Sequence, residues 1–381
     1  MKPLNKLKVA IAHDQLVEFG GAEKVLLVLK EIFPKADIYT TVYKNNFLVS
    51  FKKNVSNWKI YVAWFGKISV LKNFYSPFRF LTPLIWESFD LSKYDLVISS
   101  SGSWMSKGVI TKKPTIHISY IHHPPRYLYG YETAIEWQKY LLVKIYAYIV
   151  NHFLRLWDFE SSQKPDYLIA NSYETKKRIE KFYRQDSTVI YPPVEIPKKI
   201  NLKINKKNKY YITVSRLARA KHVDILIKAA NQYGFNLKVI GTGRDEKYLK
   251  SIAGKTVEFF GYTDEKTKNQ LYENAYGFLF ASVDEEFGIA PVEAMGYGLP
   301  VIAFNSGGIP EYLKNNFNGY LYNQLTPKGL IEKINLLEKL SKNKLLIMKK
   351  NARKTAKKFT KEIFKEKFIN FIKSKINFKN A

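Results

Sequence analysis

The chain contains no cysteine in its 381 residues. This absence excludes disulfide bonds, and it also excludes metal sites that are built on thiolates. A chain without cysteine fits a reducing compartment, so we expect a cytoplasmic protein.

Long uninterrupted hydrophobic runs are also missing. The first apolar run, VAIA, ends at His13 and Asp14 and is too short for a signal peptide. The most apolar long segment, residues 140–157, is interrupted by a lysine, a histidine and an arginine. We therefore expect neither a signal peptide nor a transmembrane helix.

Acidic residues are scarce relative to basic ones. The chain has 33 Asp and Glu against 62 Lys and Arg, which gives a formal net charge of +29. A field of this sign attracts nucleic acid, an anionic membrane or phosphorylated substrates, although lysines on exposed helices could produce the same charge without any partner. No recognised nucleic-acid-binding motif accompanies the charge, so we expect no nucleic-acid partner.

No acidic residue occurs between Asp37 and Glu87, and basic residues alternate there with aromatic ones. This composition suits an anionic membrane surface, where cations meet lipid phosphates and rings lie at the level of the headgroups. A loop whose rings cover the core of the domain is the alternative, and single-stranded nucleic acid is a weaker one. The residues are Lys44, Lys52, Lys53, Lys59, Lys67, Lys72, Arg79, Trp58, Trp64, Phe65, Phe74, Tyr75, Phe78, Phe80 and Trp86.

The order of apolar runs predicts two α/β domains. Short buried strands alternate with helical patterns, about five strands in each half, which is typical of parallel sheets in doubly wound domains. Prolines, lysines and asparagines interrupt the pattern over residues 191–211. We expect a first domain over 1–195, a second over 196–365, and a helical tail over 366–381 that packs back on the first.

Two cations follow the first strand of the second domain. Arg216 and Lys221 lie in VSRLARAK, where the strand passes into a helix. Ligands of open parallel sheets bind at the carboxyl ends of the strands, so both cations could contact one anion such as a diphosphate. Two solvated charges at a helix start are the alternative.

A cluster of acids begins the stretch SVDEEFGIAPVEAMGYG, in which a strand, a loop and a helix follow one another. The helix has Pro291 in its first turn, and its first amides form a phosphate-binding site. Glu285 and Glu293 can each accept two hydroxyl hydrogen bonds, which suits a vicinal diol such as a ribose. Alternatively, Asp284 and Glu286 stabilise the helix start and Glu293 is a surface acid.

Together these motifs resemble the family-4 retaining glycosyltransferases. The two glutamates in EEFGIAPVEAMGYG, the pair in SRLARAK, and the segments VIGTGR and VEFFGY occur in the order of that family. In the first half, HDQLVEFGGAEKVL is similar to the family's first glycine loop, and SYIHHPPRYLYGYE resembles a segment of bacterial polysaccharide and O-antigen mannosyltransferases. The resemblance implies the GT-B fold, in which two Rossmann-like parallel-sheet domains face each other across a cleft.

The resemblance also implies roles for single residues. Catalysis would involve His122, Glu285, Arg216 and Lys221. The donor would be bound by Gly20, Gly21, Arg216, Lys221, Gly241, Gly243, Tyr262, Glu285, Phe287, Gly288, Ile289, Ala290 and Glu293, and the acceptor by His123, Arg126 and Tyr127. Two positions depart from the family: His123 replaces a threonine, and Glu286 replaces a common glycine. A Glu286 side chain that faces the cleft would change donor binding, whereas one that faces solvent would not.

In such enzymes the acceptor hydroxyl attacks from the side on which the diphosphate leaves, and the protein positions the groups and stabilises charge. The cations and helix amides would replace a divalent ion, so we expect no metal and no other cofactor. HHPPRY favours GDP-mannose as the donor, with a lipid-linked or other glycan acceptor of cell-surface polysaccharide, such as lipopolysaccharide, at the inner face of the plasma membrane. The alternatives are a UDP-sugar transferase of the same family, a sugar-nucleotide epimerase and a non-catalytic membrane-associated module.

Overall fold

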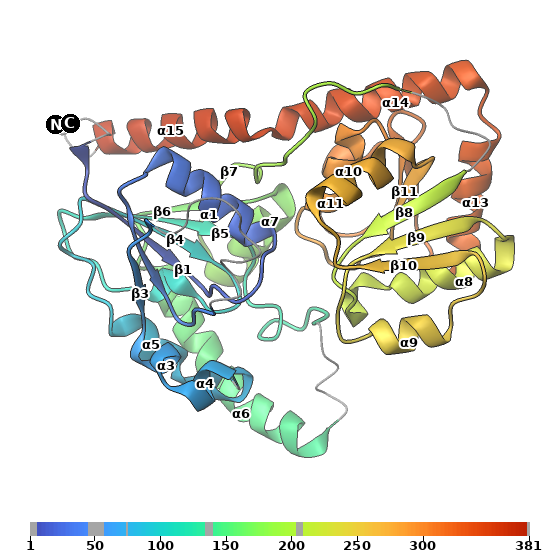
Figure 1. Cartoon of the computed structure of the whole chain (residues 1–381). Coiled ribbons are helices and arrows are strands. Elements are labelled where there is room, and N and C mark those ends of the chain that lie inside the picture. The colour runs from blue at the N-terminus through green and yellow to red at the C-terminus, as the bar shows by residue number, and fades with distance from the viewer. Residues whose placement is uncertain (1–5, 45–56, 74, 134–139, 203–208, 379–381) are drawn as a thin grey trace. The chain divides into compact units, whose positions relative to one another are not determined.

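The protein is described by a computed structural model that covers residues 6–44, 57–73, 75–133, 140–202 and 209–378. It forms two compact units (Figure 1). The first unit comprises Met1–Tyr131, Trp137–Pro193 and Lys361–Ala381, and the second comprises Glu132–Glu136 and Val194–Thr360.

The first unit is built on a parallel sheet with strand order β3-β2-β1-β4-β5-β6-β7. Its strands are β1 (Val9–His13), β2 (Asp37–Thr40), β3 (Ile60–Val62), β4 (Leu96–Ser101), β5 (Ile116–Ile121), β6 (Tyr167–Ala170) and β7 (Thr188–Val189). Its helices are α1 (Gly21–Ile32), α3 (Trp64–Lys67), α4 (Ser69–Asn73), η2 (Ser76–Leu81), α5 (Thr82–Glu87), η3 (Ser106–Gly108), α6 (Leu141–Ser162), α7 (Tyr173–Tyr183) and α15 (Lys361–Phe378).

One face of this sheet is covered by α1 and by α15, which comes from the end of the chain. In Figure 1 the two helices lie beside each other, and Phe364 and Phe368 of α15 are buried with Leu29 of α1 and Ile98 of β4. The C-terminal segment was expected to join the first domain only from residue 366, whereas the first unit includes it from Lys361.

The C-terminal helical segment is interrupted at Thr360, between η6 and α15. Thr360 is extended, with φ −69° and ψ 161°, and forms a bridge with Val194, whose amide donates to the Phe359 carbonyl. This backbone pairing ends one helix and starts another. Phe359 therefore packs in the second unit and Phe364 in the first, instead of sharing one helix face.

Helix α6 belongs to the other side of the sheet and is held by a buried ion pair. Asp158 of α6 contacts Lys107 of η3, and both side chains are almost fully buried. The Asp158 carboxylate also accepts from the hydroxyls of Tyr129 at 2.7 Å and Tyr183 at 3.3 Å. Burial, followed by the charge of Asp158, raises the pKa of both tyrosines, so both stay protonated donors.

The segment rich in lysines and rings divides its aromatic side chains between core and surface. Phe65 and Trp86 are fully buried, as expected for rings that cover the core, whereas Trp64 and Phe80 are exposed. Lys52, Lys53 and Phe74 lie outside the described residues. The buried rings match the alternative in which rings cover the core of the domain, and membrane contact of the exposed rings stays a prediction.

The second unit contains a parallel sheet with strand order β10-β9-β8-β11-β12-β13. Its strands are β8 (Tyr210–Val214), β9 (Asn236–Ile240), β10 (Val257–Gly261), β11 (Gly277–Phe280), β12 (Val301–Phe304) and β13 (Gly319–Tyr322). Its helices are η5 (Arg219–Lys221), α8 (Val223–Tyr233), α9 (Glu246–Ser251), α10 (Glu265–Asn274), α11 (Ile289–Gly296), α12 (Ile309–Tyr312), α13 (Pro327–Glu338), α14 (Lys342–Ala356) and η6 (Lys357–Phe359).

The predicted architecture of two Rossmann-like parallel-sheet domains is confirmed. The estimate of about five strands in each half was too low, because β2, β3 and β13 were not anticipated. The expected cleft concerns the relative placement of the domains and stays a prediction.

Replacement of Asp158 tests the buried ion pair. In Asp158→Ala, Lys107 keeps a buried charge without its carboxylate, so the free energy of unfolding should fall by about 3–5 kcal/mol. Asp186→Ala, which removes the exposed partner of Lys176, is the control and should cost less than about 1 kcal/mol. Urea unfolding of both variants measures the difference. Equal losses would show that burial adds nothing to the Asp158 pair.

Candidate donor-binding and catalytic site

The predicted donor residues of the second unit gather at one edge of its sheet. Each follows the carboxyl end of a parallel strand, and such ends share one edge. Arg216 and Lys221 follow β8, Gly241 and Gly243 follow β9, Tyr262 follows β10, and Glu285, Phe287, Gly288, Ile289, Ala290 and Glu293 follow β11. The structure thus brings the sequence-predicted residues of this domain to a common edge.

Lys221 and Glu285 form the ion pair at this edge. The Lys221 ammonium contacts Glu285 Oε2 and lies 3.3 Å from Ser282 Oγ, and the Ser282 hydroxyl donates to Glu285 Oε2 at 2.7 Å. Both charged side chains are partly exposed. The loops after β8 and β11 are therefore joined by a charged contact that a ligand can still approach.

Two glycines that follow β12 hold the backbone of the Glu285 loop. The Gly308 amide donates to the Glu285 carbonyl at 2.8 Å, and Gly307 has φ +59°, a left-handed conformation that suits glycine. A Cβ atom on Gly307 would overlap the Glu285 carbonyl oxygen, and one on Gly308 would overlap that of Glu286. Only residues without side chains allow this approach of the two backbones.

Glu293 is buried on α11, with 6% of its surface exposed, so the alternative of a surface acid is wrong. It is the fifth residue of the helix, so it lies just beyond the first turn. Lys268 Nζ of α10 lies 4.0 Å from Glu293 Oε2. Burial opposes the charged form of Lys268, but the charges of Glu293 and Glu265 leave its pKa raised, so Lys268 stays protonated.

The start of α11 is packed against aromatic side chains. Gly288, with φ +80°, precedes the helix, and its carbonyl accepts from the Tyr312 hydroxyl at 3.2 Å. Phe287 is buried, with ring centroids 5.3 Å from Tyr312 and 5.2 Å from Phe359. Phe287 is therefore a packing residue of the loop. Ile289 and Ala290, the first residues of the helix, are partly exposed.

Glu286 is 7% exposed, so the alternative in which it faces solvent is wrong.

The remaining predicted donor residues differ in their exposure. Gly241 has φ +131°, and a Cβ atom there would overlap the Ser215 carbonyl, so this glycine lets β9 end close to the turn after β8. Gly243 approaches the Leu217 carbonyl in the same way. Arg216 and Tyr262 are exposed. The two glycines shape the edge, whereas Arg216 and Tyr262 are accessible to a ligand.

In the first unit, His122 belongs to a chain of buried polar side chains. Its Nε2 lies 2.7 Å from Ser100 Oγ, which lies 3.0 Å from His13 Nδ1, and His13 Nε2 lies 3.4 Å from Glu23 Oε1. The other Glu23 oxygen accepts from the Gly20 amide at 2.8 Å, where Gly20 and Gly21 begin α1. The glycine loop and His122 are thus connected through three side chains.

The proton positions in this chain follow from its ends. An ionised Glu23 only accepts, so a neutral His13 carries its hydrogen on Nε2 and accepts from Ser100 at Nδ1. The Ser100 oxygen then accepts from His122 Nε2, which leaves the lone pair of a neutral His122 on Nδ1. With His13 neutral, the chain selects one tautomer of His122, whereas a protonated His13 would make the Ser100 hydroxyl donate to His122 Nε2.

The predicted acceptor residues follow strand β5, as His122 does. His123 is half-buried over Gly102, where an added Cβ atom would lie 3.2 Å from its Nε2. Tyr127 donates to the Ser103 carbonyl at 3.3 Å, and the Arg79 guanidinium lies 4.3 Å from its ring centroid. Burial raises the pKa of Tyr127, so its hydroxyl stays protonated. Arg126 is partly exposed nearby in the chain.

Several residues that shape the site were missed from the sequence. His13, Ser100 and Glu23 complete the polar chain, and Asp14 accepts from the amides of Gly102, Trp104 and Ser106, which fixes the loop after β4. In the second unit, Ser282, Lys268 and the pair Gly307 and Gly308 were missed. The sequence does contain a signal for His13 and Asp14. They form a polar pair at the carboxyl end of the first buried strand, where ligands of parallel sheets bind.

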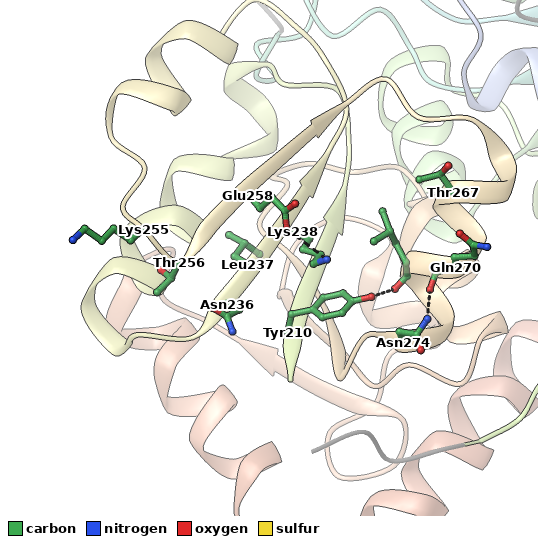
Figure 2. A pocket seen from close by; sticks show the side chains of 11 residues that line it. Tyr210, Asn236, Leu237, Lys238, Lys255, Thr256, Glu258, Thr267, Gln270 and Asn274 are labelled. Carbon is green, nitrogen blue, oxygen red and sulfur yellow. Dashed lines mark hydrogen bonds and ion pairs between the residues drawn. The ribbon is translucent and has the colours of Figure 1, made fainter. Parts of the chain in front are cut away.

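A separate pocket lies at the opposite, amino-terminal end of strands β8–β10 (Figure 2). Tyr210, Lys238 and Glu258 line it from the sheet and Gln270 and Asn274 from α10. Lys238 Nζ lies 3.5 Å from Glu258 Oε2 and 4.5 Å from the centroid of the Tyr210 ring. None of the predicted site residues lines this pocket.

The model of the family described as glycosyl transferases group 1 matches residues 195–355. The second unit carries a glycosyl transferases group 1 domain. The chain is 26% identical over 257 residues to the GtfA subunit of the UDP-N-acetylglucosamine–peptide N-acetylglucosaminyltransferase of Streptococcus agalactiae, covering 63% of this chain and 48% of that protein. It is 26% identical over 191 residues to alpha-1,3/1,6-mannosyltransferase ALG2 of Homo sapiens, covering 41% and 46%. The chain thus spans about half the length of these curated relatives.

Solved structures with the same fold include Anabaena Alr3699/HepE in complex with UDP-glucose. That protein has a TM-score of 0.71 at 18% identity, over 96% of this chain and 99% of its own. S. aureus TarM has a TM-score of 0.68 at 15% identity, over 96% and 99%. The likeness extends over both units, so the group 1 domain is one half of a GT-B fold.

Substitution of Gly307 in the group 1 domain tests the close approach of the two loops. Gly307→Ala should lower the free energy of unfolding by about 1–2 kcal/mol for its left-handed backbone and by about 1–3 kcal/mol more for displacement of Glu285. Gly234→Ala is the matched control, because Gly234 has φ +84° but nothing within 4 Å of an added Cβ. Urea unfolding compares them. Equal losses would contradict the tight contact.

Proposed function

We propose that this chain is a retaining glycosyltransferase of family 4 that transfers a hexose from a nucleotide sugar to a glycan acceptor. The observation that carries the proposal is the charged edge of the group 1 domain, where the Lys221–Glu285 pair and the buried Glu293 accompany the amino end of α11. These groups have the chemistry that a sugar diphosphate requires. The matched family and the curated relatives named above are glycosyltransferases, which supports it.

The proposed chemistry assigns a task to each group. Arg216, Lys221 and the first amides of α11 stabilise the diphosphate as it leaves, since cations and helix amides bind phosphate oxygens. Glu293 accepts from the ribose hydroxyls, and Glu285 orients both Lys221 and the transferred sugar. Because Lys221 already contacts Glu285, a bound diphosphate shares that ammonium with the carboxylate. No divalent ion is required, so a chelator should leave turnover unchanged.

In the first unit, His122 would contact the donor sugar, with Gly20 and Gly21 allowing close approach of donor or acceptor. The chain from Glu23 to His122 would keep the His122 tautomer constant during the reaction. His123, Arg126 and Tyr127 would bind the acceptor.

We propose GDP-mannose as the donor and a lipid-linked or other glycan as the acceptor, in the synthesis of a cell-surface polysaccharide such as lipopolysaccharide. HHPPRY and the partial likeness to the mannosyltransferase ALG2 favour mannose. The solved structures of HepE contain UDP or UDP-glucose, which favours a UDP-linked sugar as the alternative. We place the enzyme at the inner face of the plasma membrane, where its positive charge meets anionic lipid.

A donor screen tests the activity. Purified protein should release GDP from GDP-mannose in the presence of lipid-linked acceptor extract, and EDTA should not reduce the rate. Release of UDP alone would contradict GDP-mannose as the donor and identify a UDP-linked sugar instead, while the proposed transfer activity would stand. Conversion of the donor to another nucleotide sugar without acceptor would instead identify an epimerase. No turnover of any common nucleotide sugar would contradict an enzyme.

Substitutions at the charged edge test the assigned roles. Glu293→Gln and Lys221→Met should each lower kcat/KM by about 10- to 100-fold, because each removes one charged hydrogen bond to the donor. Lys228→Met is the control for the second variant, since Lys228 also pairs with a carboxylate of the same domain, Asp224 at 2.9 Å. Glu332→Gln, an exposed acid on α13, is the control for the first. Steady-state nucleotide release measures all four, and full activity of Glu293→Gln would exclude its role in donor binding.

A further inference from the structure

Helix α6 exposes a continuous apolar face. Leu142 is 82% exposed, Ile149 54% and Phe153 64%, although each is a large hydrophobic side chain. Other exposed members of α6 are Leu141, Val143, Ile145, Tyr146, Tyr148, Leu156 and Phe159. These residues form what we call the outer face of α6. A surface helix normally carries polar side chains on the side that faces away from the core.

The inner face of the same helix is well defined, so the exposure does not result from loose packing. Ala147, Asn151, Leu154 and Asp158 are buried and recur every three or four residues, which places them on one side. Leu142, Ile145, Ile149, Phe153 and Leu156 recur with the same spacing on the opposite side. The helix is therefore apolar on the side that is turned away from its buried residues.

Neighbouring elements extend this surface. Element η2 packs against α6, and the Tyr146 hydroxyl donates to the Pro77 carbonyl of η2. Trp64 of α3, Phe80 of η2 and Leu84 of α5 are further exposed large side chains of these adjoining elements. Large contiguous apolar patches on a soluble surface mark interaction sites.

The charges around the outer face are mostly positive. Lys144 is exposed on α6, and Lys67 is exposed on α3. Within α6, whose residues are all described, Glu160 is the one acidic side chain that is exposed. A second copy of this chain that covered α6 with its own α6 would place cations against cations. An anionic lipid surface offers both an apolar layer and the opposite charge.

We propose that the outer face of α6, with α3, η2 and α5, is the surface by which this chain lies on an anionic bilayer. Among the residues that the structure describes, no helix is long and apolar enough to cross a membrane. The geometry fits a helix in the plane of the interface, its apolar side chains among the acyl chains and its cations at the headgroups. This inference gives the proposed membrane location its contact surface and does not depend on sugar transfer.

Vesicle sedimentation without any donor tests the surface. The full-length chain should sediment with vesicles of phosphatidylcholine containing about 30% phosphatidylglycerol, and less with phosphatidylcholine alone. Ile149→Ser with Phe153→Ser should weaken the apparent affinity by about tenfold or more, because two inserted side chains are lost. Its melting temperature should not fall, since both residues are exposed.

The matched control is Ile347→Ser with Phe317→Ser, which removes an isoleucine and a phenylalanine that are 58% and 45% exposed in the second unit. This variant should bind vesicles like the unchanged chain. Equal vesicle binding by both double variants would overturn the proposal. So would a dimer of the unchanged chain in light scattering that Ile149→Ser with Phe153→Ser converts to a monomer. Nucleotide-sugar turnover, measured separately, decides the proposed enzyme activity whatever the vesicles show.

Discussion

The candidate donor site depends on the contact between the backbones of Gly307–Gly308 and Glu285–Glu286. The loop after β12 lies so close to the loop after β11 that side chains are excluded at both glycines. This contact holds the Glu285 carbonyl, and with it the position from which the Glu285 side chain reaches Lys221. The backbone of the Glu285 loop is fixed by this contact, and the Ser282 hydroxyl then holds the Glu285 carboxylate beside Lys221.

The fold was largely predictable from the sequence, because buried parallel strands give unmistakable apolar runs between helical patterns. The predicted parallel-sheet domains are confirmed by the sheets, and residues 195–355 match the glycosyl transferases group 1 model. The break at Thr360 was not predictable, since it arises from a bridge to Val194, which is remote in the sequence. Phe359 and Phe364 had the spacing of one helix face until that pairing separated them.

The candidate site was predictable where a residue follows a strand directly, as Glu285 and Lys221 do. The assigned roles of these residues rest on the family resemblance and remain predictions. What the sequence could not show is contact across the sheet: Ser100 lies on β4, His13 on β1 and His122 after β5, and only the sheet order makes them neighbours. The outer face of α6 was not predicted for a related reason. Apolar residues occur on all sides of this helix, so the sequence alone does not show which of them are exposed.

The buried pair of Lys107 and Asp158 attaches only the inner side of α6 to the rest of the first unit. Its inner side is bound to η3 by a contact that cannot be loosened without leaving a charge in the core. Its outer side contributes nothing to that contact. Separation of α6 from η3 would therefore leave buried charges without partners, so the attachment of the outer side to the first unit is costly to break.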